Sequence, residues 1–292
     1  MRIFICIVLS GLFFSAFAQD DLMSELEQLD KEDINYAIQT FKGTRIINGQ
    51  SVETKGKGEL EFIFAHRFGR LNSGSYNFWG LDDAFVRLGL EYGITDRLGV
   101  GIGRSSTDKT FDSFVRYKAF RQSSGALNFP VTITVIGTGY IKTSPRAKDN
   151  PQFRMEDRLA YSFGILVARK ITSNLSLQLT PVFVHRNAVN QFNENNDDIA
   201  LGLGGRYKIT RSVALSGEYY YRLNARENSP NFDGVGFGVD IETGGHVFQL
   251  VFTNSAGMFE RALVSETIGD FFDGDVHFGF NITRNFQIVK RK

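Results

Sequence analysis

The chain has 292 residues, and its 33 lysines and arginines nearly balance its 32 aspartates and glutamates, for a net charge of +1. This balance gives no support to a nucleic-acid-binding protein, which needs a clustered excess of basic residues. The only cysteine, Cys6, lies within the leader described below, so the mature chain has no thiol for a disulfide scaffold or a thiolate metal site.

The first residues have the pattern of a cleaved secretion signal. Arg2 gives a positive start, an apolar run follows, and Ala16-Phe17-Ala18 is a small-x-small cleavage site. The apolar run is shorter than the roughly 18 residues that a membrane-spanning helix needs. We therefore predict a signal peptide over residues 1–18 and export from the cytoplasm.

Residues 19–57 differ in pattern from the rest of the chain, and we predict an N-terminal periplasmic arm or plug there. The stretch 20–36 is acidic and has leucines at helical spacing, which fits a short helix or a mobile arm. The stretch 41–53 fits an extra strand, a periplasmic segment or a small plug, and its pattern does not choose among them. A periplasmic partner would bind through this arm.

From residue 58 to residue 286 the chain alternates apolar and polar residues, the period of a strand whose two faces differ. We predict about twelve strands, at 59–69, 83–93, 97–106, 110–121, 128–142, 157–171, 175–187, 198–209, 213–225, 233–242, 246–254 and 274–286. Residues 287–292 would form a C-terminal tail. The last strand closes on Phe286, which resembles the signal that the barrel-insertion machinery recognises.

The connections between these strands alternate in length. Tight turns share an Ile-Thr pair at Ile94-Thr95, Ile171-Thr172 and Ile209-Thr210, whereas the opposite connections, such as 143–156 and 255–273, are mostly longer. An even number of strands with short turns at one end and long loops at the other is typical of outer-membrane barrels. The predicted fold is therefore an all-β, antiparallel up-and-down transmembrane β-barrel in the outer membrane.

The two faces of the predicted strands differ in polarity. One face is apolar and rich in aromatic residues, as a lipid-facing wall requires. The other carries the candidate lumen or pore-lining residues Arg67, Arg87, Glu91, Arg116, Lys118, Arg158, Arg186, Arg206, Glu218, Arg222 and Asp240. A soluble barrel would show the same alternation, but the export signal and the unequal loops favour a membrane barrel.

Charges on an inner face must be hydrated or paired, because burying a lone charge is costly. Two interpretations stay open. One is a water-filled pore with an electropositive constriction that favours anions. The other is a lumen closed by salt bridges across the barrel or by the N-terminal segment.

Glycines recur on the charged face, as in Gly99-Val100-Gly101-Ile102-Gly103. No predicted helix follows them, so they do not form a nucleotide-binding loop. We predict that they make room for bulky side chains opposite or allow tight curvature.

Candidate chemistry is sparse. The four histidines have no metal-ligand spacing, and we predict no catalytic, metal or cofactor-binding residue and no enzyme. Outer-membrane phospholipases use a Ser-His pair on the lipid-facing wall, and His66 and His185 face outward in our register, with Ser73, Ser75 and Ser106 as candidate neighbours. A lipid-modifying enzyme is therefore a minor alternative. The acidic clusters at 193–198 and 270–275 fit a solvated loop better than a calcium site.

Several motifs occur together, including His66-Arg67-Phe68-Gly69, Gly80-Leu81-Asp82-Asp83 and the run from Arg87 to Asp96. With Phe41-Lys42-Gly43-Thr44-Arg45 upstream, the chain resembles a family of β-barrel proteins of unknown function from Gram-negative outer membranes. The resemblance implies the barrel fold and the outer-membrane location. It implies no activity, so no functional residue is carried over.

We predict a narrow channel or accessory transporter for small polar or anionic solutes. The alternative is a closed structural or interaction barrel that holds a periplasmic or surface partner. The expected partners are the lipid bilayer, lipopolysaccharide and the barrel-insertion machinery. We expect no nucleic acid as a partner.

Overall fold

The computed structural model describes residues 33–145 and 154–289, so the predicted signal peptide and most of the acidic stretch lie outside the described residues. The chain divides into two units. In the smaller unit, strand β1 (Ile34–Tyr36) pairs antiparallel with β6 (Ser123–Gly125). The guanidinium of Arg121 lies over the ring of Tyr36, 4.0 Å from its centroid.

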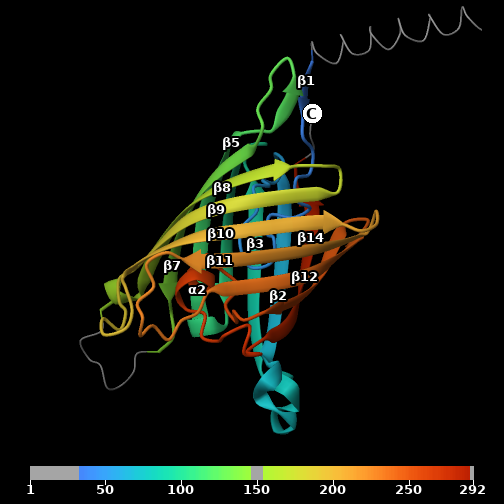
Figure 1. The fold of residues 1–292 in the computed structure, drawn as a ribbon. Helices are drawn as coiled ribbons and strands as arrows, with labels where there is room; N and C mark the ends of the chain where they lie inside the picture. Colours follow the sequence, from blue (N-terminus) through green and yellow to red (C-terminus); the bar gives the residue numbers. More distant parts are fainter. Residues whose placement is uncertain (1–32, 146–153, 290–292) are drawn as a thin grey trace, which may run out of the picture. The chain divides into compact units, whose positions relative to one another are not determined.

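The larger unit is a closed antiparallel barrel, in which the described residues form twelve strands (Figure 1). In chain order these are β2 (Glu59–Arg70), β3 (Ala84–Gly93), β4 (Leu98–Ser105), β5 (Thr110–Phe120), β7 (Thr132–Lys142), β8 (Leu159–Lys170), β9 (Leu175–Arg186), β10 (Asp197–Lys208), β11 (Val213–Arg222), β12 (Gly234–Thr243), β13 (His246–Thr253) and β14 (His277–Gln287). Strand β14 pairs with β2 and closes the barrel. The predicted fold class is confirmed.

One end of the barrel, here called the turn end, carries the tight Ile-Thr turns. In each of them the threonine hydroxyl accepts hydrogen bonds from the backbone N–H groups two and three residues later, at Thr95, Thr172 and Thr210. A side chain that closes a local turn in this way fixes where the strand reverses. The opposite end, the loop end, carries the longer connections, including the 3₁₀ turns η1 (Leu71–Ser73), η2 (Ser75–Gly80), η3 (Thr107–Lys109) and η4 (Glu156–Arg158).

The faces of the wall have the predicted polarity. Exposed outer positions are apolar and include Leu88, Leu90, Ile102, Val115, Phe163, Leu177, Leu203, Phe237, Leu250 and Phe252. Charged residues on the inner face, such as Arg67 and Glu91, are fully buried. An apolar outer belt around a polar interior is what a wall in contact with lipid requires. Among the described residues, no helix is long and apolar enough to cross a membrane.

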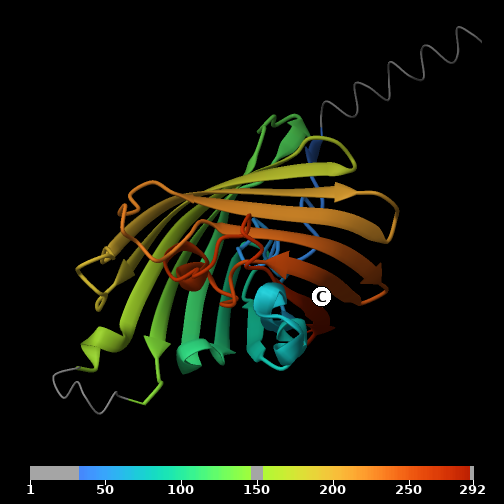
Figure 2. The ribbon, with the colours of Figure 1, turned by 60° about the horizontal axis from the view of Figure 1, so that its bottom comes forward.

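Two segments fill the interior of the barrel (Figures 1 and 2). Residues 39–57, here called the plug segment, precede β2. Their apolar side chains Phe41, Ile46, Ile47 and Val52 are buried. Residues 254–269, here called the inserted loop, follow β13 and contain α2 (Glu260–Ser265). Their side chains Phe259, Leu263 and Val264 are buried. The stretch 41–53 thus contributes buried side chains inside the barrel.

Wall glycines make room for the plug segment, as predicted. A Cβ atom at Gly204 would clash with Ile46 Cδ1, and one at Gly236 would lie 3.3 Å from Ile47 Cγ2. Other inner glycines face wall side chains, since a Cβ at Gly101 would clash with the ring of Phe114. These inner-face glycines thus leave space for bulky side chains of the plug segment or of the wall itself.

Replacing Gly204 by valine is expected to lower the free energy of unfolding by about 1–3 kcal/mol, because the added methyl groups overpack the contact with Ile46. Urea titration of the refolded barrel measures the loss. Adding Ile46→Ala should restore much of the stability. Gly137→Ala is the matched control, because a Cβ there meets no atom within 4 Å. Equal stability of wild type and Gly204→Val would contradict this packing.

Candidate functional site

The plug segment folds into a small hairpin. The backbone N–H of Ile46 donates to the carbonyl of Gly49 at 2.9 Å, and the N–H of Ser51 donates to the carbonyl of Thr44 at 2.9 Å. Arg45 and Gln50 form an antiparallel bridge between these two bonds. The tip of the hairpin therefore directs a run of consecutive backbone N–H groups to one side.

Glu218, a buried residue of β11, receives this hairpin tip. Its carboxylate accepts the backbone N–H groups of Ile47 at 3.3 Å, Asn48 at 2.8 Å and Gly49 at 3.0 Å. Three donors converge on one carboxylate, so a single wall side chain satisfies the N–H groups that the tight turn leaves unpaired. Glu218 thus holds the plug segment by its backbone.

Strands β9, β7 and β5 bind the second half of the plug hairpin. Gln178 of β9 donates to the carbonyl of Gln50 at 2.7 Å and accepts the N–H of Val52 at 2.9 Å. Thr134 of β7 donates to the carbonyl of Val52 at 2.7 Å. Arg116 of β5 donates to the carbonyl of Glu53 at 2.5 Å. The wall thereby supplies the hydrogen bonds that a neighbouring strand would give.

Strands β13, β14 and β2 complete this ring around the hairpin. Gln249 donates to the carbonyl of Ile46 at 2.7 Å, and Asn281 donates to the carbonyl of Ile47 at 3.1 Å. Arg67 donates to the side-chain carbonyl of Asn48 at 2.8 Å. Contacts therefore come from all around the wall. A buried polar network in which the members are paired favours one fixed arrangement.

The charges inside the barrel are largely paired with one another. Arg87 lies 2.5 Å from Asp112, the Nε of Arg116 lies 3.1 Å from Glu91, and the Nε of Arg206 lies 3.0 Å from Asp240. Each of these three pairs joins two strands that are separated by one strand of the barrel. The interior is therefore charge-paired rather than mostly cationic.

The predicted lining residues can now be placed. Those buried on the inner face are Arg67, Arg87, Glu91, Arg116, Arg186, Arg206, Glu218, Arg222 and Asp240. Lys118 is half-buried and lies 3.2 Å from Glu53 of the plug segment. Arg158 is not on the wall: it lies in η4 and donates to the carbonyls of Lys142 at 2.9 Å and Ser144 at 2.7 Å. That any of them lines a conducting pore remains a prediction.

The sequence-based set misses several inner acids. Asp112 shares its face with Arg116 by strand parity, so the alternation already contained this signal. Glu61 has the same parity as Arg67, and it accepts from Thr44 at 2.6 Å and Lys55 at 2.7 Å. Glu260 comes from the inserted loop, for which strand parity gives no signal.

The plug segment and the inserted loop meet inside the barrel. Arg45 lies 3.4 Å from Glu260 at the start of α2. The hydroxyl of Tyr140 on β7 donates to the other oxygen of Glu260 at 3.4 Å, and its ring lies 5.7 Å from that of Phe259. The two segments that fill the lumen thus contact each other as well as the wall.

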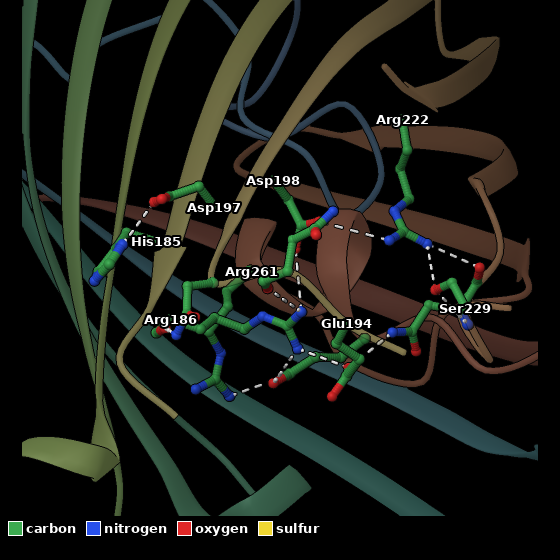
Figure 3. A network of polar contacts seen from close by, with 12 residues as sticks. His185, Arg186, Glu194, Asp197, Asp198, Arg222, Ser229 and Arg261 are labelled. Carbon is green, nitrogen blue, oxygen red and sulfur yellow. Dashed lines mark hydrogen bonds and ion pairs between the residues drawn. The ribbon is translucent and has the colours of Figure 1, made fainter. Parts of the chain in front are cut away.

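A network of arginines and carboxylates at the loop end reaches the inserted loop, because Arg186 lies 4.0 Å from Glu266 (Figure 3). Arg186 lies 3.0 Å from Glu194 and 3.1 Å from Asp198, and Arg222 lies 3.5 Å from the second oxygen of Asp198. Arg261 of α2 lies 3.2 Å from Glu266. Arginines thus pair with Glu194 and Asp198 of the acidic cluster at 193–198. Within the described residues, no group of His, Cys, Asp or Glu is placed to hold a metal ion.

The loop that carries Glu194 is expected to loosen in acid. Burial raises the pKa of the Glu194 carboxyl, but hydrogen bonds donated by Arg186 and Asn231 outweigh burial, and the pKa lies below its usual value of 4.5. A lowered folded-state pKa stabilises the fold above the usual value, and this contribution is lost as the pH falls through the lowered pKa.

Amide hydrogen exchange of residues 188–196, corrected for the intrinsic rate, measures this loosening on either side of that pKa. Glu194→Gln should remove most of the pH dependence, because its side chain does not titrate. Glu227→Gln, in the next loop, is the control. Equal pH dependence in wild type and Glu194→Gln would contradict the assignment.

His66 and His185, the two histidines predicted to face outward, contact residues other than the predicted serines. His185 Nδ1 lies 2.6 Å from Asp197, and both side chains are exposed. His66 stacks on Phe280, with ring centroids 5.2 Å apart. Within residues 33–145 and 154–289, neither histidine is hydrogen-bonded to a serine. The described structure therefore gives the phospholipase alternative no Ser-His pair.

Comparisons with known proteins agree with the architecture. A family model described as a membrane-bound beta barrel domain (DUF5777) matches residues 41–286. No curated protein shows significant similarity to this chain.

Several solved structures are similar to this barrel at low sequence identity. The NanC porin shares 11% identity, with a TM-score of 0.48 over 78% of this chain and 98% of that one. An outer-membrane channel from Pseudomonas putida F1 shares 12% identity, with a TM-score of 0.47 over 80% and 98%. Outer membrane phospholipase A from Escherichia coli shares 10% identity, with a TM-score of 0.42 over 77% and 92%. None of these structures assigns a role to a residue of this chain.

Proposed function

The chain belongs to the family of membrane-bound β-barrel domains, and we propose that it is an outer-membrane barrel whose resting state is closed by its own plug segment and inserted loop. It would act through its loop-end surface and its N-terminal arm rather than as an open pore. The observation that supports this most strongly is the ring of wall side chains around the plug backbone, with Glu218 at the hairpin tip.

The energetic argument for a closed state is the hydrogen bonding inside the lumen. Removing the plug segment would leave Glu218, Gln178, Gln249 and Asn281 without the backbone groups that they bind. Each lost net hydrogen bond costs about 0.5–1.5 kcal/mol, so the closed state is favoured unless water or a partner replaces these bonds.

Solute permeation tests the closed state. Proteoliposomes that contain the mature protein are mixed with an isotonic solution of a small sugar, and their swelling is followed by light scattering. We expect swelling no faster than that of empty liposomes. Heat-modifiable gel mobility verifies that the barrel is inserted. Rapid swelling by the wild-type protein would overturn the proposal.

The outer-membrane location is part of the same proposal. The exposed apolar belt requires lipid around the wall, and the predicted signal peptide would export the chain. Lipopolysaccharide and phospholipid would surround the barrel, the barrel-insertion machinery would assemble it, and a periplasmic partner would bind the N-terminal arm. Separation of inner and outer membranes on a sucrose gradient tests the location, and recovery with the inner membrane would contradict it.

A second candidate function is a gated passage for small polar solutes, which would open when the plug segment leaves. The wall under the plug favours it, because Glu218, Gln178 and Thr134 would leave a wettable lumen. The variant Ile46→Cys/Gly204→Cys tests it, since a Cβ at position 204 would lie 3.7 Å from Ile46 Cγ1. A gated passage predicts solute uptake in cells that oxidation abolishes and reduction restores. Uptake unaffected by oxidation would exclude it.

A further inference from the structure

A small polar cavity of about 30 Å³ lies at the turn end of the barrel, where the start of the plug segment meets the wall. It is here called the turn-end pocket. The plug segment contributes Thr40 and Lys42, and the ends of β8, β10 and β12 contribute Lys170, Arg206, Lys208 and Glu242. Since one water needs roughly 10–15 Å³ on this measure, the pocket has room for a single small polar group.

The cations at the turn-end pocket outnumber the acids beside them. Lys42 lies 2.9 Å from Glu242, and Arg206 pairs with both Glu242 and Asp240. These two acids therefore balance two cations. Lys208 is half-buried, and its ammonium group has no ion-pair or hydrogen-bond partner among the residues that the structure describes. Because a cleft with an excess of one charge concentrates the opposite ion, the pocket favours an anion.

Three further donors at the turn-end pocket are unpaired and can be reached from it. The hydroxyls of Thr40 and Ser176 and the Nη1 of Arg206 have no hydrogen-bond partner within residues 33–145 and 154–289. None of the three is among the unpaired polar atoms that are closed off from solvent, so each keeps accessible surface. Their side chains are nevertheless held in place, with exposed fractions of 3%, 5% and 7%. Polar groups of buried side chains are nearly always satisfied, here by a group within the pocket.

We propose that the turn-end pocket binds a phosphate group between the wall and the start of the plug segment. Guanidinium and ammonium groups offer donors only, so the ligand must supply acceptors. A phosphate group supplies negative charge for Lys208 and oxygens on several sides, which Arg206, Ser176 of β9 and Thr40 can bind together. This inference goes beyond the proposed function, because it requires the plug segment in place but not a barrel that fails to conduct.

Isothermal titration of the detergent-solubilised mature protein with inorganic phosphate, at constant ionic strength, tests the ligand class. We expect saturable binding at one site per chain, at least about tenfold tighter than the binding of acetate. Glycerol 3-phosphate is the second probe, and the tighter of the two phosphates identifies the source as free phosphate or as a phosphate ester. Absence of saturable binding of both phosphates, or binding of acetate as tight as theirs, would overturn the proposal.

A pair of variants tests the location of the site. Lys208→Gln should weaken phosphate binding about tenfold or more, because it removes a lining cation without breaking an ion pair of the described structure. Arg211→Gln is the matched control, since Arg211 is exposed on the adjoining turn and lies outside the lining. Heat-modifiable gel mobility shows that both variants are folded. Undiminished binding by Lys208→Gln, or an equal loss in both variants, would refute the location.

Amide hydrogen exchange tests separately whether the plug segment contributes to the site. Thr40 and Lys42 line the pocket, so saturating phosphate should slow exchange of residues 40–44 in the wild-type protein. The same phosphate concentration should have a much smaller effect on Lys208→Gln. Exchange of these residues that phosphate leaves unchanged in the wild type would show that the ligand does not bridge the plug segment and the wall, and would overturn the proposed position.

Discussion

Replacing Glu218 by leucine is expected to lower the free energy of unfolding by at least about 3 kcal/mol. The change leaves the buried N–H groups of Ile47, Asn48 and Gly49 without their acceptor, and each unsatisfied group costs about 1–3 kcal/mol. The hairpin of the plug segment would also lose these hydrogen bonds to β11. Urea titration followed by heat-modifiable gel mobility measures the loss.

Two controls separate the acceptor role of Glu218 from the size of its side chain. Glu218→Gln retains one carbonyl oxygen of similar geometry, so its loss of stability should be clearly smaller than that of the leucine variant. Glu227→Leu changes an exposed loop residue and should be nearly neutral. If the glutamine and leucine variants were equally stable, the carboxylate would not be the anchor of the plug segment.

Replacing Asp112 by alanine is expected to cost about 3–5 kcal/mol, because it leaves the buried guanidinium of Arg87 without its counter-charge. The two groups are fully paired, with bonds from both Nε and Nη2 of Arg87 to Asp112. Chemical denaturation of the refolded barrel measures the loss.

The double variant Arg87→Met/Asp112→Leu completes this test. Removing both charges removes the unpaired ion, so the double variant should be more stable than Asp112→Ala alone. Asp82→Ala, on an exposed loop, is the matched control. A double variant as unstable as the single one would contradict the view that charge pairing, rather than shape, is what matters at this position.

The barrel was predictable from the sequence because its signals are local and repeated. Alternation with a period of two assigns each strand residue to the inner or the outer face of the wall. The unequal lengths of the connections distinguish the turn end of the barrel from the loop end. The Ile-Thr pairs mark the turns because the threonine hydroxyl closes them within three residues. These features depend on neighbours in sequence, which a single chain displays directly.

The contents of the lumen were much less predictable. The plug segment has no period, because its backbone is paired by side chains such as Gln178 and Gln249 that lie far away in sequence. The inserted loop resembles an external loop in composition, and only the fold turns its apolar residues inward. Arg158 has the parity of the inner face but lies beyond the end of its strand.

The balance of charge inside the barrel could be predicted only in part. Asp112 and Glu61 follow from strand parity, whereas Glu260 and Glu266 come from the inserted loop. A count restricted to the wall residues therefore overstates the positive charge of the lumen. The alternation of residues along each strand thus identifies the candidate lining residues. Whether these residues line open space depends on the plug segment and the inserted loop, which have no periodic pattern.

The most direct test of the closed barrel is single-channel conductance in a planar bilayer, comparing the mature wild-type protein with a variant that lacks residues 40–53 of the plug segment and residues 256–266 of the inserted loop. Both proteins must first show heat-modifiable mobility, so that insertion is established independently. The wild-type barrel is expected to be silent, and the variant is expected to give discrete conductance steps. Steady conductance by the wild-type barrel, or silence of an inserted deletion variant, would contradict the account that the plug segment and the inserted loop close the lumen.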